Sequence, residues 1–300
     1  MEETETMRTP ISLVEETGQG ADETSVTAKH QALQALIAGM GRVIVAFSGG
    51  VDSTLVLKVA YDALGHDALG VTAISPSLAA AEREEAASLA RLIGVPHLFI
   101  ETHELDNPHY AANPSNRCYF CKGELYGVLA PMAAARGYRF ILDGMNADDV
   151  GDFRPGQRAA REHGVRSPLQ EVGLTKAEVR ALARRLGLPN WDKPAMACLA
   201  SRIPYGRPVT IQALRQIEEA EAFLRSLGFR QLRVRHHDNL ARIEVEPAML
   251  PAVLARREEI VKGLRAVGYV FVTLDLAGFR SGSMNEALPR AHPRDEDRDP

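Results

Sequence analysis

A glycine turn between an apolar segment and a helical pattern constrains this chain more than any other feature. The apolar run at 43–47 predicts a buried strand, which Ser48-Gly49-Gly50 ends. A helix is predicted directly afterwards, at 53–65, because apolar residues recur there along one face. At such a junction, free N–H groups and the positive end of the helix dipole meet where glycine lets an anion approach closely. The sequence therefore predicts an anion site formed by Ser48, Gly49, Gly50, Val51, Asp52, Ser53 and Thr54.

This motif differs from the phosphate loop of kinase-type enzymes, which ends in Gly-Lys-Ser/Thr, because the stretch contains no lysine. Ser-Gly-Gly-Val-Asp-Ser instead resembles the pyrophosphate loop (PP-loop) of ATP pyrophosphatases. The resemblance implies that the loop holds the β- and γ-phosphates of ATP while a substrate oxygen attacks the α-phosphate and pyrophosphate leaves. The alternative is a strand–turn–helix junction without a ligand, which so narrow a motif after an apolar strand disfavours.

The composition is that of an ordinary globular protein. Of the 300 residues, 45% are hydrophobic and 25% are charged, which suits one large or two modest domains. No apolar run approaches the roughly 20 residues that span a bilayer, and the acidic N-terminus is unlike a signal peptide, so we expect a cytoplasmic protein. The net charge of −4 argues against an affinity that rests on a long nucleic-acid backbone, but it leaves room for a local basic patch.

Strand and helix patterns alternate through the first part of the chain. Such alternation favours an α/β fold, a parallel sheet with helices on both faces, whose ligands bind beyond the carboxyl ends of the strands. Strands are predicted at 42–47, 68–74, 95–101 and 138–143, and helices at 29–40, 53–65, 80–93, 121–136 and 175–186.

After about residue 207 the pattern predicts a small α+β domain. Its parts are a helix at 210–227, a hairpin of strands 229–235 and 241–246 joined by 236–239, a helix at 249–266 and a strand at 269–275. We therefore divide the chain into an acidic disordered tail (1–26), an ATP-binding domain (27–206), the small domain (207–286) and a second disordered tail (287–300).

Three cysteines give the second chemical signal. Cys118 and Cys121 form a Cys-x-x-Cys pair, and Cys198 follows far along the chain. The odd count disfavours a disulfide framework and favours reactive or metal-binding thiols. A zinc site usually has a fourth ligand, whereas three cysteines can hold a [4Fe-4S] cluster with one iron open to an exogenous ligand such as sulfide. A redox pair, or unrelated thiols near a helix start, are the alternatives.

The segment that carries Cys198 extends the resemblance. Lys193-Pro-Ala-Met-Ala-Cys-Leu-Ala-Ser-Arg-Ile-Pro-Tyr-Gly206, taken together with the PP-loop, closely resembles the LarE family of ATP-dependent sacrificial sulfur transferases. The resemblance runs from about 29 to 286 and implies the PP-loop ATP pyrophosphatase fold, also called adenine nucleotide alpha hydrolase-like. Further matching pieces lie at 75–77, 143–149, 154–156, 167–169, 174–180 and 278–285.

The family resemblance implies a reaction. Family members adenylate a carboxylate of pyridinium-3,5-biscarboxylic acid mononucleotide with ATP and replace an oxygen by sulfur, and two rounds give the organic part of the nickel-pincer cofactor of lactate racemase. In single-cysteine members, the cysteine that matches Cys198 gives up its own sulfur and becomes dehydroalanine. Other members deliver sulfur from an iron–sulfur cluster on three cysteines. Because Cys118 and Cys121 accompany Cys198, this chain resembles the cluster-bearing branch, and the resemblance also implies a homo-oligomer, a hexamer.

The resemblance also implies roles for residues around the nucleotide. We expect Lys176 to be catalytic together with Cys198. Related PP-loop enzymes place a lysine at this position near the α- or γ-phosphate. Because a lysine at the start of a helix interacts unfavourably with the helix dipole, its presence there favours a functional role. Asn146 and Asp149 follow the predicted strand that ends at Asp143, on the ligand side of the sheet, where they are expected to orient ATP or the substrate, unless they only form a turn. Asp52 is a candidate ligand of a Mg²⁺ ion that neutralises the phosphates, or else a helix cap.

The implied substrate carries two carboxylates and a phosphate, so its site is expected to contain arginine forks. Arg233 and Arg235 alternate along a predicted strand and so share one face, across from Glu244, which could pair with an arginine or bind a metal. Each arginine, taken singly, could equally be a surface residue. The candidate substrate ligands are Arg202, Arg233, Arg235, Arg280 and Ser281.

Three other functions compete with this interpretation. A PP-loop tRNA thiolase also adenylates its substrate, and some carry a three-cysteine [4Fe-4S] cluster, but the net charge and the Cys198 segment argue against it. An amide-forming PP-loop ligase would not need three cysteines. A nucleotide-binding regulator without activity is disfavoured because Ser48, Asp52 and Lys176 are all present.

Overall fold

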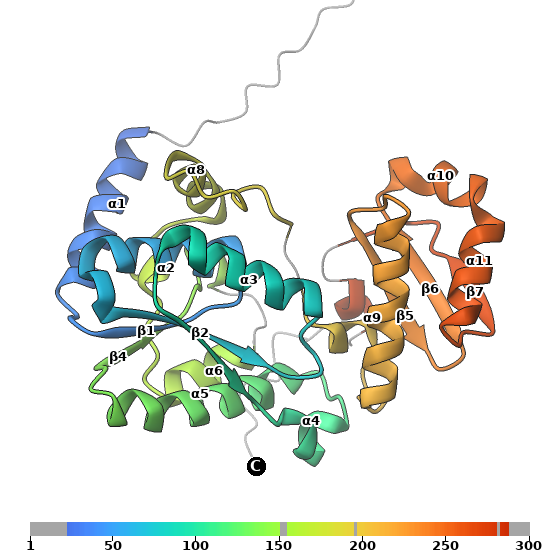
Figure 1. Ribbon diagram of the computed structural model, residues 1–300, viewed down its shortest axis with the longest axis horizontal. Coiled ribbons are helices and arrows are strands. Elements are labelled where there is room, and N and C mark those ends of the chain that lie inside the picture. Colours follow the sequence, from blue (N-terminus) through green and yellow to red (C-terminus); the bar gives the residue numbers. More distant parts are fainter. Residues whose placement is uncertain (1–22, 151–154, 195–196, 281–282, 288–300) are drawn as a thin grey trace, which may run out of the picture.

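The computed structural model describes residues 23–150, 155–194, 197–280 and 283–287, which form two units, each built on its own sheet (Figure 1). The larger unit contains four parallel strands in the order β3-β2-β1-β4. Their bounds are β1 (Val43–Ala46), β2 (Ala68–Ile74), β3 (His97–Glu101) and β4 (Phe140–Leu142). The predicted α/β class with a parallel sheet is confirmed.

Helices cover both faces of the larger sheet because successive residues of a strand point to opposite sides. Val43 and Val45 are fully buried against the layer of α1 (Glu23–Ala38), α2 (Val51–Leu64), α3 (Ala80–Ile93) and α8 (Lys176–Arg185). Ile44, between them, packs on the opposite layer of α5 (Arg117–Ala135) and α6 (Pro155–Glu162). Figure 1 shows these two helical layers above and below the sheet.

The strand order creates a switch point at β1. The chain proceeds from β1 to β2 and β3 on one side and returns to place β4 on the other. The segments that leave the carboxyl ends of β1 and β4 therefore meet, and this is where ligands bind in open parallel sheets. Residues 47–50 follow β1 there, and residues 143–149 follow β4.

The smaller unit packs helices on one mixed sheet. Strands β5 (Leu232–His237) and β6 (Leu240–Val245) are antiparallel, and β7 (Phe271–Leu274) runs parallel to β6. Its core joins the inner face of this sheet to α9 (Ile211–Ser226) and α11 (Arg257–Ala266). Shorter elements elsewhere are α4 (Pro108–Ala111), α7 (Pro168–Glu171), α10 (Leu250–Ala255), η1 (Gly65–Asp67), η2 (Glu104–Asp106), η3 (Ala147–Asp149), η4 (Leu199–Arg202), η5 (Pro247–Met249) and η6 (Ser283–Ala287).

Several element boundaries differ from the prediction. The hairpin turn is only Asp238-Asn239, because His236 and His237 pair with Ala241 and Leu240 and Asp238 takes a left-handed φ of 56°. The helix expected at 249–266 is interrupted at Arg256, which caps α10.

The helix after the first cysteine begins earlier than predicted. It starts at Arg117 instead of residue 121, so Cys118 and Cys121 both lie in its first turns. The tail expected over 1–26 is also too long, because Glu23 begins α1 and Val26 is buried. The rest of that tail, residues 1–22, and residues 288–300 lie outside the described residues. The domain boundary at 206–207 stays a prediction.

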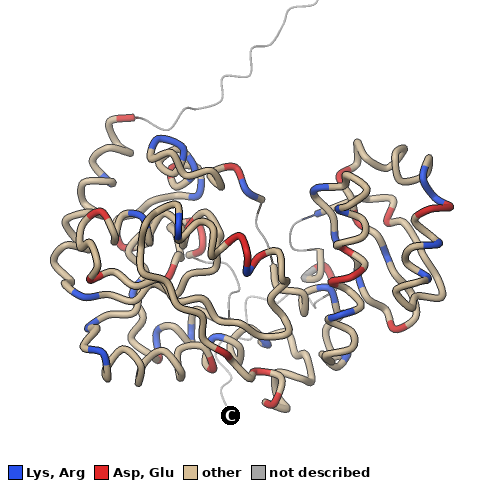
Figure 2. The backbone as a smooth tube through the Cα atoms, viewed as in Figure 1, with Lys and Arg blue, Asp and Glu red and all other residues tan. Residues whose placement is uncertain are grey.

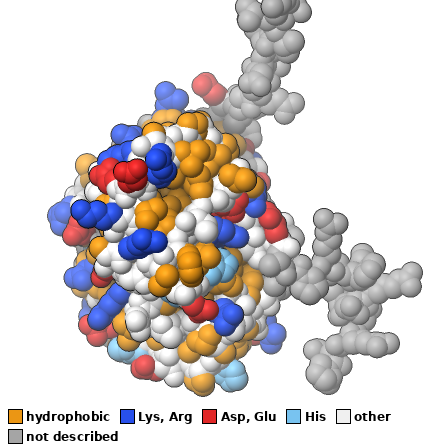
Figure 3. Space-filling model, turned by 90° about the vertical axis from the view of Figure 1, so that its right-hand side faces the viewer, with side chains coloured by type: hydrophobic (Ala, Val, Ile, Leu, Met, Phe, Trp, Pro, Cys, Tyr) orange, Lys and Arg blue, Asp and Glu red, His pale blue; other side chains and the backbone are white. Residues whose placement is uncertain are grey.

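The surface of both units mixes charges with apolar side chains. Figure 2 shows Lys and Arg interspersed with Asp and Glu over both units. Figure 3 looks onto the end that carries the small sheet and shows apolar side chains gathered between charged ones. Leu254, Val270, Phe271 and Leu276 are exposed in this unit. No helix in the described part of the chain combines the length and apolar character needed to cross a membrane.

Candidate functional site: a nucleotide loop, three thiols and an interdomain cleft

The predicted anion loop follows β1 and leads into α2. Gly49 has a φ of +72°, which a residue without a side chain adopts without strain. The Ser48 N–H donates to the Ser53 hydroxyl at 3.2 Å, and the Ser53 and Thr54 hydroxyls both donate to the Gly50 carbonyl, at 3.1 and 2.8 Å. Ser53 and Thr54, which were predicted as members of the anion site, are buried, and their hydroxyls bond within the loop.

Three predicted residues from distant segments meet at the helix start. The Lys176 ammonium forms an ion pair with the Asp52 carboxylate, and the Asn146 side-chain amide donates to the same carboxylate at 3.1 Å. Asp52 lies in the first turn of α2, Asn146 follows β4, and Lys176 begins α8. The predicted grouping of these side chains at the carboxyl end of the sheet is therefore present in the structure.

Asp149 has a structural task in this arrangement. Its carboxylate accepts a hydrogen bond from the Asn146 N–H at 3.0 Å, and the Asn146 side chain accepts one from the Asp148 N–H at 3.0 Å, so the two residues form a capping box for η3. The Asp148 carboxylate accepts from the Lys176 N–H at 2.8 Å. Asp149 therefore holds Asn146 in place, and its role as an ATP ligand stays a prediction.

Gly144, which follows β4, allows the chain to pass close to the start of α2. No role was predicted for it from the sequence. A Cβ atom at this position would lie 2.7 Å from the Ser53 nitrogen and 3.1 Å from the Asp52 carbonyl carbon, both of which are backbone atoms. The Asp-Gly-Met-Asn sequence after a predicted strand was the available signal.

We expect Gly144→Ala to destabilise the protein by about 1–3 kcal/mol, because the backbone at the start of α2 must move to admit a methyl group. The free energy of unfolding in urea measures this effect. Gly127→Ala is the matched control, because Gly127 lies in a helix with no atom within 4 Å of the added Cβ. Equal unfolding midpoints for the two variants would show that the close approach is not important.

Two further residues contact the loop from the segment between α8 and η4. Asn190 is buried and donates through Nδ2 to the Gly49 carbonyl at 3.1 Å and to the Thr54 hydroxyl at 2.9 Å. The Lys193 ammonium lies 3.4 Å from the same carbonyl and pairs with the Glu85 carboxylate at 2.7 Å. Neither was predicted as a site residue, because in the sequence Asn190 is a turn former and Lys193 only a part of the matching segment.

The three thiols share one electrostatic neighbourhood. Cys118 and Cys121 lie in the first turns of α5, and Cys198 precedes η4; Cys121 and Cys198 pack against the same apolar cluster. Burial, and then the neighbouring Cys198, raise the pKa of Cys121 to about 12. Cys118 is exposed on the surface of α5, and Arg117 and Lys122 oppose the upward shift of its pKa. The Cys121 thiol is therefore protonated at neutral pH in the metal-free protein.

The raised pKa of Cys121 predicts slow alkylation of the iron-free protein. Only the thiolate reacts, and its fraction at pH 8 is far below that of an ordinary thiol, so we expect iodoacetamide to modify Cys121 at least about a hundredfold more slowly than free cysteine. The rate should rise as the pH is raised from 8 to 10. Mass spectrometry of the peptide that contains Cys121 follows the reaction. A rate equal to that of free cysteine at pH 8 would contradict the buried environment.

The fit of the thiols to a metal depends on the kind of centre. Within the described ranges, no group of three or more His, Cys, Asp or Glu side chains converges on a point where one ion could bind. An iron–sulfur cluster is wider than a single ion and is bound at its corners by soft thiolates. Arg117, buried beside the thiols, donates to the Ala200 carbonyl at 3.0 Å and supplies a positive charge next to the Cys198 segment. The donor set therefore fits a cluster in its chemistry.

Two of the arginines that were predicted to bind substrate form ion pairs with buried carboxylates. Arg202 makes a two-pronged pair with Glu221 at 2.8 and 3.1 Å, and Arg235 makes one with Glu244 at 2.9 and 3.0 Å; these side chains are at most 2% exposed. Arg202 also donates to the Cys198 carbonyl at 3.2 Å. Of the two roles considered for Glu244, the structure shows the pairing with an arginine.

Arg235 extends the same support to the next residues of this segment. It donates to the Ser201 carbonyl at 2.7 Å, beyond its pair with Glu244. The two arginines therefore hold the Cys198 segment against the smaller unit. Their roles as substrate ligands stay predictions.

Arg233 differs from these two arginines. Its guanidinium lies 4.5 Å from the centre of the Phe279 ring, is largely buried, and has no carboxylate partner among the described residues. Burial, and then the nearby Arg202 and Arg235 charges, lower its pKa to about 10. An anion would relieve this concentration of positive charge. Arg280 pairs with Glu286 at 3.1 Å on the surface, and Ser281 lies outside the described residues.

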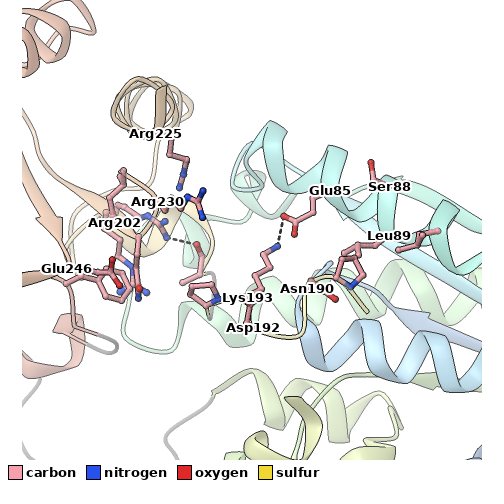
Figure 4. Close-up of a pocket in the computed structure, with 18 residues that line it drawn as sticks. Glu85, Ser88, Leu89, Asn190, Asp192, Lys193, Arg202, Arg225, Arg230 and Glu246 are labelled. Atoms are coloured by element: carbon pink, nitrogen blue, oxygen red, sulfur yellow. Dashed lines mark hydrogen bonds and ion pairs between the residues drawn. The ribbon is translucent and has the colours of Figure 1, made fainter. Parts of the chain in front are cut away.

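Arg233 is one of the residues that line a cavity of about 990 Å³ between the two units (Figure 4). Figure 4 shows Arg202, Arg225 and Arg230 on the side of the smaller unit, and Glu85, Ser88 and Asn190 on the opposite side. Lys193 points toward Glu85 on that same side. Asn190 and Lys193, which contact the Gly49 carbonyl of the predicted anion loop, thus line the same cleft as these arginines.

Comparison with known proteins connects this site to characterised chemistry. No protein-family model matches the chain. An uncharacterized protein of Synechocystis is 48% identical over 87% of this chain and 98% of its own length. Pyridinium-3,5-bisthiocarboxylic acid mononucleotide synthase of Lactiplantibacillus plantarum is 42% identical over 89% of this chain and 97% of its own. The tRNA-specific 2-thiouridylase MnmA of Xanthobacter autotrophicus is 30% identical over 51% of this chain and 49% of its own.

The second of these similarities extends over nearly the full length of both proteins, and the third is a partial match that agrees with the parallel sheet and the loop after β1. The chain therefore belongs to the family of pyridinium-3,5-bisthiocarboxylic acid mononucleotide synthase, the LarE family of sulfur transferases within the PP-loop superfamily.

Proposed function

We propose that this protein is an ATP-dependent sulfur transferase that converts the carboxylates of pyridinium-3,5-biscarboxylic acid mononucleotide to thiocarboxylates. The observation that carries the proposal is that one segment joins both halves of the chemistry. Asn190 and Lys193 in this segment contact the nucleotide loop at Gly49, and Cys198 follows a few residues later. An activated acid formed at the loop and a sulfur donor at Cys198 would therefore belong to one continuous site.

The first step is adenylation. A carboxylate oxygen of the substrate attacks the α-phosphorus of ATP, the bond from this phosphorus to the bridging oxygen breaks, and pyrophosphate leaves. The loop N–H groups and the dipole of α2 stabilise the charge on the phosphates. Lys176 supplies a positive charge at the same helix start, where it pairs with Asp52 in the present structure. A Mg²⁺ ion bound to ATP would add charge, with Asp52 as the candidate protein ligand.

The second step is sulfur transfer. A sulfur nucleophile attacks the acyl carbon, and AMP leaves with the electron pair of the carbon–oxygen bond. If Cys198 itself supplies the sulfur, its Cβ–S bond then breaks as the Cα proton is removed, which leaves dehydroalanine. The Arg202 and Arg235 contacts to the Cys198 and Ser201 carbonyls fix the donor segment during this step.

We assign Cys118, Cys121 and Cys198 to an iron–sulfur cluster as the alternative sulfur source. When bound, a [4Fe-4S] cluster with one open iron would carry a transferable sulfide. In that case Cys198 is a ligand that is not consumed. Anaerobic purification followed by iron and sulfide analysis tests the assignment, with an absorption band near ~400 nm as the expected signature. An iron-free protein that still makes product in repeated turnovers would contradict it.

The experiment for the whole proposal is an oxygen-free incubation with ATP, Mg²⁺ and the pyridinium dicarboxylate. We expect pyrophosphate release together with a product in which sulfur replaces oxygen, both detected by mass spectrometry. The loss of one H₂S from the Cys198 peptide identifies the sacrificial route. If neither pyrophosphate nor a sulfur-bearing product forms, the proposal is wrong.

A second candidate function is thiolation of tRNA, because the chain shares a partial match with a tRNA-specific 2-thiouridylase. A filter-binding assay with bulk tRNA separates the two functions. Binding that weakens steeply with salt would favour the thiolase. For the sulfur transferase we expect no such binding, in agreement with the net charge of −4.

The wider context follows from the family. We propose that the product serves the nickel-pincer cofactor of lactate racemase in the cytoplasm, and that the protein forms homo-oligomers, a hexamer being the expectation. The exposed apolar residues of the smaller unit, among them Phe271 and Val270, are consistent with such an assembly. Light scattering of the purified protein measures the oligomeric state.

A further inference from the structure

The orientation of one peptide group decides whether the nucleotide loop can bind an anion. Gly49 and Gly50 are joined by a peptide whose C=O and N–H point in opposite directions. An anion cradle needs the N–H on the ligand side, because a carbonyl oxygen there would repel phosphate. Two consecutive glycines permit either orientation at little cost. Something outside the Gly49–Gly50 peptide must therefore select one.

The Gly49 carbonyl is held by two side chains from the segment between α8 and η4. Asn190 donates to it at 3.1 Å, and the Lys193 ammonium lies 3.4 Å from it. Both donors approach from the side of the interdomain cleft, which they help to line (Figure 4). With the carbonyl held on this side, the Gly50 N–H is directed to the other, where it makes a long contact of 3.4 Å to the Ser48 hydroxyl oxygen that a phosphate oxygen would replace.

Both donors are themselves fixed. Asn190 is 5% exposed, and its Nδ2 also donates to the Thr54 hydroxyl at 2.9 Å, which in turn donates to the Gly50 carbonyl at 2.8 Å. One amide thus contacts the Gly49 carbonyl directly and the Gly50 carbonyl through Thr54. Lys193 is anchored at 2.7 Å by Glu85 on α3, so its position depends on that helix as well.

We propose that Asn190 and Lys193 are positioning residues that hold the Gly49–Gly50 peptide in the orientation that binds the β- and γ-phosphates of ATP. This inference rests on the proposed use of ATP but not on the identity of the acid that is adenylated. The two residues act through the Gly49 peptide and need not touch the nucleotide.

The test measures binding to the purified protein without the second substrate. Isothermal titration with Mg²⁺–ATP, pyrophosphate and AMP is carried out on Asn190→Leu and Lys193→Met. We expect each variant to bind ATP and pyrophosphate roughly tenfold more weakly, in line with the loss of one or two hydrogen bonds. Affinity for AMP, which has no β- or γ-phosphate, should change less than about twofold. A merely structural role would weaken all three ligands alike.

Two controls sharpen this result. Lys193→Arg keeps a charged donor and should retain most of the affinity, whereas Lys58→Met removes a lysine of α2 that pairs with Asp62 and should change nothing. If Asn190→Leu does not fold, Lys193→Met carries the test alone. Unchanged pyrophosphate affinity in Lys193→Met, or an equal loss for AMP, would overturn the positioning role. A wild-type protein that binds no ATP would overturn the proposed function as well, so the two failures are distinguishable.

Discussion

Replacement of Cys198 by alanine is expected to lower formation of the sulfur-bearing product by at least about a thousandfold, because either sulfur route passes through this thiol. Pyrophosphate release in the first turnover should stay within about threefold of wild type, since the loop, Lys176 and Asn190 are untouched. Rapid-quench measurement of pyrophosphate and mass spectrometry of the product in the same samples give both quantities. The variant therefore separates adenylation from sulfur transfer.

The matched comparison is Cys121→Ala. It should abolish turnover if a cluster supplies the sulfur, and it should leave a single turnover intact if Cys198 itself is the donor. Thermal unfolding of both variants checks that a lost thiol has not disturbed the apolar cluster that Cys121 and Cys198 share. Product at the wild-type level in Cys198→Ala would contradict the role of this residue on either route.

The second large effect is expected at Glu221. This buried carboxylate accepts from Arg202 at 2.8 and 3.1 Å, from Arg225 at 2.9 Å and from the Val234 N–H at 3.1 Å. Glu221→Gln leaves the Arg202 guanidinium buried and without its countercharge, which typically costs about 3–5 kcal/mol. We expect a loss of that size in the free energy of unfolding in urea.

The same substitution should also loosen the Cys198 segment, because Arg202 joins Glu221 to the Cys198 carbonyl. Glu259→Gln in the same unit is the matched control, since Glu259 forms an exposed pair with Arg256 and should leave the unfolding midpoint unchanged. Equal stability of the two variants would show that the buried pair is not essential to the fold.

Local sequence signals predicted the nucleotide loop and the sheet. The apolar run before Ser48 and the periodic helix after it depend only on neighbours along the chain, and both are where they were expected. The resemblance placed both Asp52 and Lys176 near the nucleotide, and in the structure they form an ion pair that was not predicted. Their roles toward ATP stay predictions. Boundaries were less accurate where a turn residue decided them, as at Asp238.

The contacts of Asn190 and Lys193 with the Gly49 carbonyl could not be predicted, because they join segments that are distant in the sequence. Asn190 has the same residue type as any turn asparagine, and only its burial beside the loop reveals the contact. The arginines give a similar case. Alternation placed Arg233 and Arg235 on one face, but Glu244 neutralises Arg235 by a diagonal pair and leaves Arg233 without a carboxylate among the described residues. Which arginine is free for an anion is a property of the packed sheet.

In the proposed reaction, a substrate carboxylate attacks the α-phosphorus of ATP before sulfur enters. Substrate labelled with ¹⁸O in its carboxylates tests this directly, because the oxygen that forms the acyl adenylate leaves with AMP. We predict one ¹⁸O atom in the AMP released, together with unlabelled pyrophosphate and a thiocarboxylate. Release of ADP and phosphate, or AMP without the label, would contradict this order of steps.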